Sequence, residues 1–352
     1  MLAQAKGHAV SQVTDVHTHI VPPVLPNGKG RDARWPSIQH GENGDAAVMI
    51  AGEVFRRIDS SCWDAERRLE DMRADGVDIQ VISPMPELLS TWFSPADGDE
   101  LARAMNEFIA RMMADTPGRF RGIGMVPVQD PELAARRLAD VKAMGLSGVE
   151  IGTHIDGVPL GDRRLDAFFA AAEENDLCIM VHPLHPAGME RLVGPADLGA
   201  TAAFPLETAL AAVSLLTGGV MERFPGLKIL LSHGGGALTS ILPRLDHAWS
   251  IGMSLSRLMS EKPSEVARRF WFDSIVYDPR ALTYIADMVG DEHLVLGSDY
   301  PFSIQQPQAA AFVGGALGEL RSAKVMWRNA ENFLGSVSAP AGLAKTVAGS
   351  SI

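Results

Sequence analysis

Cysteine is scarce in this chain, with only Cys62 and Cys178 among its 352 residues. Two thiols cannot form the disulfide framework that stabilises small secreted domains, so a reducing compartment is the expectation. Cys178 lies in the apolar run 177–181, which indicates a small buried hydrophobic side chain. We therefore expect a cytoplasmic protein without disulfide bonds.

Long apolar runs and basic clusters are also missing. No uninterrupted apolar stretch reaches the length of about 18 residues that crosses a bilayer, and Met1–Val10 lacks the apolar core of a signal peptide. The 31 Lys and Arg are outnumbered by 43 Asp and Glu, a formal net charge of −12. Arginine pairs such as Arg67-Arg68 are isolated, and most pairs of this kind are solvated. We expect neither nucleic acid nor membrane as a partner, whereas a local arginine pocket can still bind a small anion.

Short apolar runs recur along the chain and are separated by segments with helical spacing, among them 131–144, 166–175 and 206–216. Continuous rather than alternating apolar character is typical of parallel strands covered by helices. The alternation predicts an α/β fold, a (β/α)8 TIM barrel. The eight runs are Val13–His19, Val77–Ser83, Phe120–Pro127, Gly148–Gly152, Cys178–Pro183, Lys228–His233, Phe270–Ser274 and Leu294–Asp299.

The segment from about 20 to 76 is longer than a connection between barrel strands requires, so we interpret it as an insertion after the first strand. Within it, Ala46–Ile50 and Val54–Ile58 are candidates for a small hairpin. Insertions of this kind lie over the active site and often carry function. Residues 336–352 predict a C-terminal extension on the surface. We expect 1–352 to form a single domain, since α/β barrels routinely exceed the usual domain length.

Histidine and aspartate residues end four of the expected strands. His17 and His19 lie two residues apart, and the alternation of a strand puts both imidazoles on one face. His182, His233 and Asp299 each end a further apolar run. A histidine pair alone fits a solvated or core pair as well as a metal site. Ordinary packing does not explain five such groups at one barrel mouth, because their burial without a metal or partners is costly.

A metal site explains this pattern. Imidazole and carboxylate ligands suit one divalent metal, Zn²⁺ first, with Mn²⁺, Fe²⁺ or Co²⁺ as alternatives. Three or four protein ligands and a water in the open position make a catalytic site. The metal lowers the pKa of such a water, which becomes a nucleophile near neutral pH.

The order of these residues along the strands resembles the amidohydrolase superfamily. The strings Ser232–Gly236 and Leu296–Phe302 are similar to the branch typified by 2-amino-3-carboxymuconate-6-semialdehyde decarboxylase, and the resemblance covers about 13–335. It departs from the type enzyme in the loop 184–200, which contains no aromatic residue where that enzyme has one. This departure leaves the substrate open.

The resemblance implies a metal site and an acid/base residue. The metal ligands would be His17, His19, His182 and Asp299. His233 would be the catalytic acid/base, a role that suits an imidazole with a pKa of about 6.5, and Asp299 counts as catalytic as well as metal-binding. Binuclear relatives carry a bridging lysine on the fourth strand, where this chain has Glu150 instead. A single metal is therefore favoured.

Three substrate-binding residues follow from the same resemblance. Arg56 resembles the insertion arginine that contacts a substrate carboxylate, and Arg244 resembles one supplied by the neighbouring subunit, which implies a homodimer. A guanidinium holds a carboxylate through two hydrogen bonds. Arg57 is the alternative to Arg56, and both arginines have ordinary surface positions as the alternative interpretation. Phe302 would line the pocket, with simple packing as its alternative.

We therefore expect a metal-dependent non-oxidative decarboxylase acting on a small unsaturated or aromatic carboxylic acid. A second hypothesis keeps the site and changes the reaction: a metal-bound hydroxide would hydrolyse a lactone, an amide or a carbon–carbon bond, or hydrate a double bond. A third, a non-catalytic metal-binding or assembly protein, is disfavoured because all five residues of the site are present.

Overall fold

The computed structural model describes residues 12–42 and 44–335, and the account below concerns this part of the chain. The expected C-terminal extension, 336–352, lies outside the described residues.

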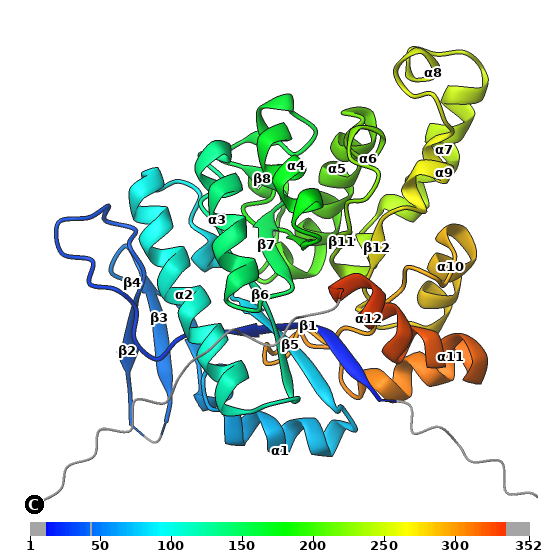
Figure 1. The fold of residues 1–352 in the computed structure, drawn as a ribbon. Helices are drawn as coiled ribbons and strands as arrows, with labels where there is room; N and C mark the ends of the chain where they lie inside the picture. Colours follow the sequence, from blue (N-terminus) through cyan, green and yellow to red (C-terminus); the bar gives the residue numbers. More distant parts are fainter. Residues whose placement is uncertain (1–11, 43, 336–352) are drawn as a thin grey trace, which may run out of the picture.

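Parallel strands form one curled sheet whose spatial order follows the sequence (Figure 1). The strands are β1 (Thr14–Ile20), β5 (Ile79–Pro84), β6 (Phe120–Gly124), β7 (Gly148–Gly152), β10 (Cys178–His182), β11 (Ile229–Leu231) and β12 (Trp271–Phe272). Most of their side chains are buried on both faces, which is why they read as continuous apolar runs. The α/β fold expected from the sequence is confirmed.

An irregular eighth segment, Leu294–Tyr300, lies between β12 and β1 and joins the two edges of the sheet. Its hydrogen bonds reach both neighbours: Val295 N–H to Phe272 O at 2.9 Å, Val16 N–H to Leu296 O at 2.8 Å and His19 N–H to Tyr300 O at 2.7 Å. The sequence predicted a regular strand over Leu294–Asp299, and this detail is wrong, since only isolated bridges form at its two ends. At its end, Asp299 adopts a left-handed backbone, with φ of 67°, so the extended segment stops there.

Helices cover the outside of the sheet, as a barrel of βα units requires. The longer ones are α1 (Ala65–Asp75), α2 (Pro95–Asp115), α3 (Pro131–Ala143), α4 (Asp166–Glu174), α5 (Phe204–Thr217), α7 (Leu238–Ser250), α10 (Pro279–Val289) and α11 (Ala309–Ala323). Shorter ones are α6 (Val220–Arg223), α8 (Leu255–Leu258), α9 (Pro263–Ala267) and α12 (Asn329–Leu334). The three helical segments expected from spacing are confirmed as α3, α4 and α5. Asp130 caps α3 by accepting a hydrogen bond from Leu133 N–H at 2.9 Å.

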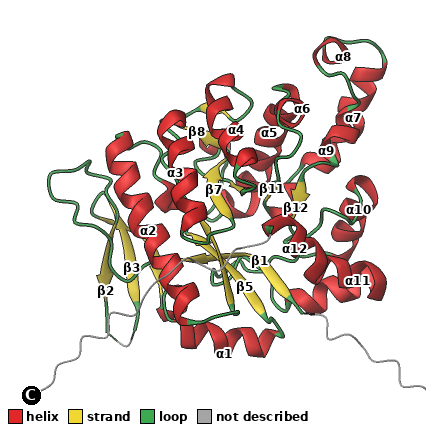
Figure 2. Ribbon diagram, viewed as in Figure 1, coloured by secondary structure: helices red, strands yellow, loops and turns green. Residues whose placement is uncertain are grey.

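The insertion after β1 contains a three-stranded antiparallel sheet, β2 (Ser37–His40), β3 (Ala46–Ile50) and β4 (Glu53–Ile58). Figure 2 shows it as a separate group of strands beside the barrel. The expected hairpin of β3 and β4 is confirmed, with Val48 paired with Arg56. The third strand, β2, was not foreseen from the sequence. The insertion thus places β4 and its arginines as a rigid element rather than as a loose loop.

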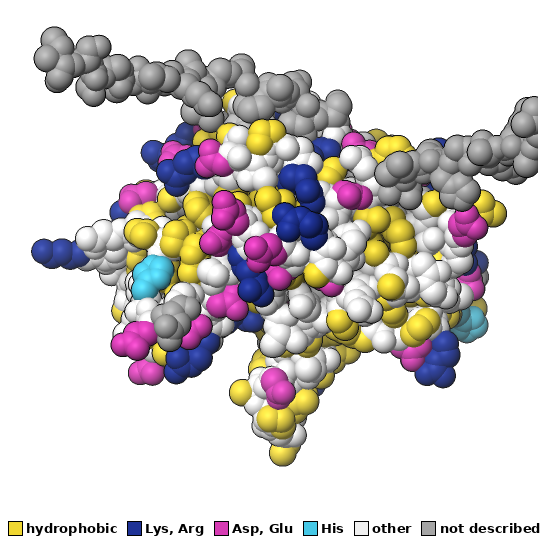
Figure 3. Space-filling model, turned by 90° about the horizontal axis from the view of Figure 1, so that it is seen from below, with side chains coloured by type: hydrophobic (Ala, Val, Ile, Leu, Met, Phe, Trp, Pro, Cys, Tyr) yellow, Lys and Arg dark blue, Asp and Glu magenta, His cyan; other side chains and the backbone are white. Residues whose placement is uncertain are grey.

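Two surface features bear on the expected partners. The helical stretch Gly199–Thr217, which includes α5, is long and apolar enough to cross a membrane by composition, yet 44% of it is buried inside the protein. Its apolar character therefore has an explanation in packing. On the face drawn in Figure 3, acidic and basic side chains are interspersed, with no continuous basic stripe.

Candidate metal centre and active site

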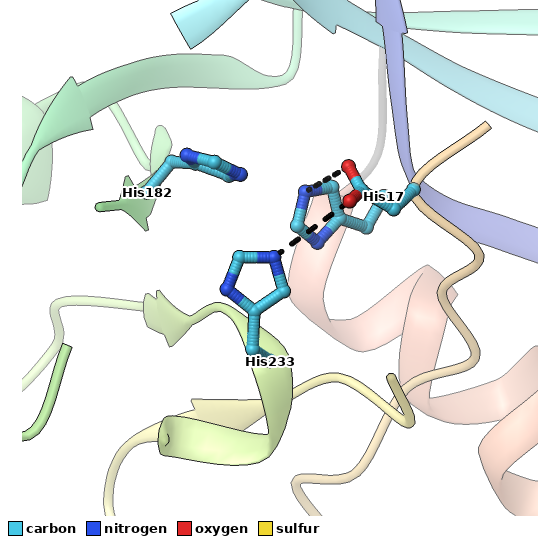
Figure 4. Close-up of side chains that lie close together, drawn as sticks. His17, His182 and His233 are labelled. Carbon is cyan, nitrogen blue, oxygen red and sulfur yellow. Dashed lines mark ion pairs between the residues drawn. The ribbon is translucent and has the colours of Figure 1, made fainter. Parts of the chain in front are cut away.

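The side chains expected to form the site converge at the carboxyl ends of the barrel strands. We call the following residues the His/Asp cluster: His17 and His19 on β1, His182 at the end of β10, His233 in the turn η6 (His233–Gly235), and Asp299 in the closing segment. Figure 4 shows the rings of His17, His182 and His233 turned towards one another. Only His233 has appreciable access to solvent, with 11% of its side chain exposed.

The polar atoms of the His/Asp cluster lie within the reach of one small cation. His19 Nε2 is 3.0 Å from His17 Nε2 and 3.1 Å from Asp299 Oδ1. His233 approaches the other carboxylate oxygen, with 3.9 Å between its Nε2 and Asp299 Oδ2. Ligand atoms of His17, His182, His233 and Asp299 all lie within 4.8 Å of one another. The structure therefore brings together every residue that the sequence proposed as a ligand or acid/base.

Hydrogen bonds to the other ring nitrogens decide which nitrogens face the centre. Nδ1 of His17 lies 2.7 Å from Asp273 Oδ2, Nδ1 of His19 2.8 Å from Pro84 O, and Nδ1 of His182 3.0 Å from Pro183 O. Each acceptor calls for a proton on Nδ1, so the Nε2 atoms face the centre, and each carries a lone pair when its ring is neutral.

These inward-facing lone pairs fit a bound cation. The Nε2 atoms of His17 and His19 lie 3.0 Å apart, a distance that requires a proton or a cation between them. Among the described residues, His182 Nε2 and Asp299 Oδ1 are buried without any hydrogen-bond partner. Metal–nitrogen bonds of about 2 Å separate neighbouring ligand atoms by about 3 Å. The donor set therefore fits one divalent metal ion.

The electrostatics of the cluster point in the same direction. Burial alone raises the pKa of a carboxyl group, but the imidazole of His19, 3.1 Å away, and the charge on His17 bring the pKa of Asp299 to about 2. Burial lowers the pKa of His19 to about 4 and holds the pKa of His182 well below its usual value. Against burial, Asp273 raises the pKa of His17 to about 9. The cluster thus combines neutral imidazoles on His19 and His182 with an ionised carboxylate on Asp299 and a preference for positive charge at His17, which a divalent cation meets.

Asp273 is a residue of this site that the sequence reasoning missed. Its Oδ2 accepts hydrogen bonds from His17 Nδ1 at 2.7 Å and from His233 N–H at 2.9 Å. Its Oδ1 accepts from Gly234 N–H at 2.8 Å and from Ile275 N–H at 3.1 Å. Asp273 thereby orients a candidate metal ligand and the turn that carries the candidate acid/base. The signal was present, since an aspartate follows the apolar start of the seventh run just as His182 ends the fifth.

Arg68 corrects a second expectation. The pair Arg67-Arg68 reads as a solvated helix face, but the Arg68 side chain is fully buried beneath β1. Its guanidinium donates hydrogen bonds to Thr18 Oγ1 at 2.9 Å, His19 O at 2.9 Å, Ser61 O at 3.0 Å and Gln80 Oε1 at 3.1 Å. It therefore fastens the backbone of His19 to the insertion. The helical spacing from Arg68 to the buried Met72 was the available signal.

Glu150 lies behind His19 rather than between two metal positions. Its Oε2 is 3.8 Å from His19 Nδ1, the ring nitrogen that faces Pro84 O. Burial raises the pKa of Glu150 to about 8, so the carboxyl group is protonated at neutral pH. A neutral acid on the far side of a ligand is poorly suited to bridge two metals, which agrees with the expectation of a single ion.

Arg56 and Phe302 form a stacked wall against the cluster. The guanidinium carbon of Arg56 lies 4.2 Å from the centre of the Phe302 ring, and that ring stacks on His19 with 5.0 Å between centroids. Burial lowers the pKa of Arg56, while the charges of Asp299 and Glu87 act in the opposite sense. Its Nε is buried without a hydrogen-bond partner within the described part of the chain. Arg57 is exposed, so Arg56 is the arginine that faces the site.

Arg244 lies away from the His/Asp cluster of its own chain. It is exposed on α7, and Figure 1 shows α7 and α8 extending away from the barrel. Large apolar side chains are exposed beyond it, with Ile251, Met253 and Leu258 each more than half accessible. The expectation that Arg244 serves a neighbouring subunit therefore stays a prediction, as does the homodimer.

Comparison with known proteins agrees with this geometry. The amidohydrolase family model matches residues 14–336. A 2-amino-3-carboxymuconate-6-semialdehyde decarboxylase of Dictyostelium discoideum is 33% identical over 330 residues, 91% of each chain. The structure of 5-carboxyvanillate decarboxylase from Sphingomonas paucimobilis has a TM-score of 0.77 at 26% identity and covers 92% of this chain and 99% of its own. A dihydroxybenzoic acid decarboxylase from Polaromonas sp., solved with bound manganese, has a TM-score of 0.73 at 22% identity, covering 92% and 97%.

The barrel, the ligand-bearing strand ends and a match over nearly the whole length define one class of protein. The chain belongs to the amidohydrolase family. Within that family it groups with non-oxidative decarboxylases, and the resemblance drawn from its sequence is confirmed.

Proposed function

We propose that this protein is a metal-dependent decarboxylase that removes CO2 from a small unsaturated or aromatic carboxylic acid. The observation that carries the proposal is the pairing of two features at one barrel mouth. One is the set of unpartnered ligand atoms on His182 and Asp299, and the other is the half-buried guanidinium of Arg56, which stacks on Phe302 next to His19. The first suits a metal and the second a carboxylate. The decarboxylases to which the chain is similar support the reaction type.

The proposed ligands are His17, His19, His182 and Asp299, because their free Nε2 and Oδ1 atoms face one point. A divalent metal held there would act as a Lewis acid that orients the substrate and lowers the pKa of bound water. We propose Zn²⁺ first, from the histidine-rich donor set. Mn²⁺ is the main competitor, since the decarboxylase from Polaromonas sp. contains it.

His233 is proposed to move the proton that decarboxylation requires. When the bond to the carboxyl carbon breaks, its electron pair stays on the substrate carbon, which then takes up one proton. His233 is the most accessible member of the cluster, and burial lowers the pKa of its imidazole, which favours fast proton release. The hydrogen bond from its backbone N–H to Asp273 fixes the turn that carries it.

Arg56 and Phe302 are proposed to hold the substrate. The guanidinium of Arg56 would take the carboxylate through paired hydrogen bonds, and its unpartnered Nε offers one of them. The ring of Phe302 lies at 18° to that of His19 and also packs against the guanidinium of Arg56, so it holds that guanidinium at the wall of the site.

The proposal is tested with the purified protein and a panel of muconate semialdehydes and hydroxybenzoates. We expect bound divalent metal by elemental analysis, CO2 release, and loss of substrate ultraviolet absorbance. We expect His233→Ala to lower kcat by about 100-fold or more while keeping its metal. His293→Ala is the matched control, because His293 precedes the closing segment at the opposite end of the barrel from Asp299.

Other outcomes distinguish the remaining hypotheses. Products whose combined mass exceeds that of the substrate by one water indicate a hydrolase or hydratase that uses the same metal centre. Bound metal without turnover of any acid indicates a non-catalytic metal-binding protein. Unchanged activity in His233→Ala removes the acid/base assignment and leaves the metal site standing.

A further inference from the structure

Two loops that follow β5 and β10 meet beside the His/Asp cluster through a pair of polar side chains. Glu87 lies in η2 (Pro86–Leu89), directly after β5, and only 10% of its side chain is exposed. His185 lies in the loop after β10, and its Nε2 is 3.3 Å from Glu87 Oε1. None of the roles proposed above uses either residue. A mostly buried carboxylate with one imidazole partner still has acceptor capacity for a ligand.

Surrounding side chains and backbone hydrogen bonds hold Glu87 and His185 in place. The ring of Trp92 lies against that of His185, with 4.8 Å between centroids. The carbonyl of His185 accepts a hydrogen bond from His154 Nε2 at 3.1 Å, and Ala187 N–H donates to the buried Glu207 carboxylate at 2.8 Å. His185 adopts a left-handed backbone, with φ of 49°, which these contacts must stabilise.

The group formed by Glu87, His185 and Trp92 also contains an unsatisfied hydrogen-bond donor. Trp92 Nε1 is buried, and within the described residues it has no hydrogen-bond partner. Buried polar groups are almost always paired in folded proteins, by protein, water or ligand. The group Glu87, His185 and Trp92 therefore offers both an acceptor and a donor that the chain itself does not use up.

Glu87 and His185 each follow a strand whose end contributes to the metal centre. Glu87 follows Pro84 by three residues, and the carbonyl of Pro84 receives the hydrogen bond of His19 Nδ1 at 2.8 Å. His185 follows His182 by the same number. Both residues therefore follow the carboxyl ends of barrel strands, on the same face of the barrel as the His/Asp cluster. A ligand bound at that face by Arg56 could extend towards Glu87.

We propose that Glu87, His185 and Trp92 form a second substrate subsite, which selects acids that carry a hydroxyl or amino group. This inference rests on the proposed function: Arg56 holds the carboxylate, and Glu87 accepts a hydrogen bond from the second substituent. An acid with a methyl group in place of the donor would desolvate the Glu87 carboxylate and leave it with His185 as its one partner among the described residues. Sites built around such buried polar groups reject analogues that lack the partner.

The test compares metal-loaded wild-type protein with Glu87→Gln and Glu87→Met. The probes are the ortho, meta and para hydroxybenzoates and aminobenzoates with the matching methylbenzoates. We expect wild type to prefer at least one donor-bearing acid over its methyl analogue by about tenfold or more in kcat/KM. Glu87→Met should abolish that preference mainly through KM, and Glu87→Gln should weaken it. Glu190→Gln is the matched control, since Glu190 lies in the loop after β10 with 77% of its side chain exposed.

The outcomes separate this subsite from the proposed reaction. If the Glu87 variants lower kcat/KM equally for donor-bearing acids and their methyl analogues, or for neither, the subsite is refuted while decarboxylation stands. If wild type releases no CO2 from any probe, the reaction fails, and calorimetric binding of the same acid pairs decides the subsite instead. Equal affinity of wild type for every donor-bearing acid and its methyl analogue refutes it. Thermal melts and metal content check that Glu87→Met folds. If Glu87→Met does not fold, the isosteric variant Glu87→Gln decides the test.

Discussion

The replacement of Asp273 by asparagine is the sharpest perturbation that this structure offers. The carboxylate accepts hydrogen bonds from four N–H groups, His17 and His233 at Oδ2, and Gly234 and Ile275 at Oδ1. An amide keeps the shape of the group but has one acceptor oxygen and one NH2 group. Whichever way it turns, one pair of N–H donors faces another donor.

The two orientations of the amide have different consequences. If its oxygen faces Gly234 and Ile275, the His17 ring loses its acceptor at Nδ1 and no longer holds its lone pair at Nε2, where the metal would bind. If its oxygen faces His17, the turn after β12 loses its anchor. Each orientation gives up two hydrogen bonds to a charged group at about 1.5 kcal/mol apiece, so we expect a loss of about 3 kcal/mol in the free energy of unfolding.

Metal affinity is the second readout, and it distinguishes orientation of a ligand from mere stability. Loss of a hydrogen-bond partner behind a ligating histidine lowers metal affinity by about 10- to 100-fold. We would measure urea unfolding and competition with a chromophoric chelator, using Asp287→Asn as the control, since Asp287 is exposed on α10 with 64% of its side chain accessible. An Asp273→Asn protein with wild-type stability and wild-type metal affinity would refute the reasoning.

Three further predictions concern the arginines and the thiols. Arg56→Met should raise KM for a carboxylate substrate about tenfold or more, because a half-buried guanidinium is lost, whereas Arg57→Met should change nothing; equal effects would contradict the assignment. Burial raises the pKa of Cys62 to about 11 and that of Cys178 to about 12. Both stay protonated at pH 8, so neither should react with a thiol reagent until urea unfolds the protein, and rapid labelling of the folded protein would count against their burial. If Arg244 serves a partner's site, co-expression of the inactive Arg56→Ala and Arg244→Ala chains in equal amounts should restore roughly one quarter of wild-type activity, because each mixed dimer contains one intact site. Light scattering checks that dimers form, and no recovery of activity would refute the shared site.

The sequence was sufficient to predict the barrel and most of the site, because both depend on local patterns. A continuous apolar run followed by a ligand-type residue is visible without any tertiary information, as in Cys178–His182. The alternation of a strand places His17 and His19 together. The hairpin of β3 and β4 follows from two short runs joined by Gly52. Each of these predictions needed only neighbouring residues.

The features that the sequence reasoning missed depend on contacts between distant segments. Asp273 and His17 are hydrogen-bonded although 256 residues separate them in the sequence, and the residues next to either one do not predict this contact. Arg68 is distinguished from its exposed neighbour Arg67 by carbonyl groups on β1 and in the insertion. The irregular closing segment arises because Asp299 turns inward. A polar residue buried by distant partners has the same local sequence as one on the surface.

The backbone of the site shows why these distant contacts are needed. His233 and Asp299 both adopt left-handed conformations, with φ of 56° and 67°, which cost roughly 1 to 3 kcal/mol each for residues other than glycine. Buried carboxylates hold both turns. Asp273 accepts from the backbone of His233 at 2.9 Å, and Asp15 accepts from Ser298 N–H at 3.1 Å and from Ser298 Oγ at 2.5 Å. Within the His/Asp cluster, this strain therefore lies in the two residues that face each other across the centre, and the acids that stabilise it also orient the groups proposed to bind metal and move protons.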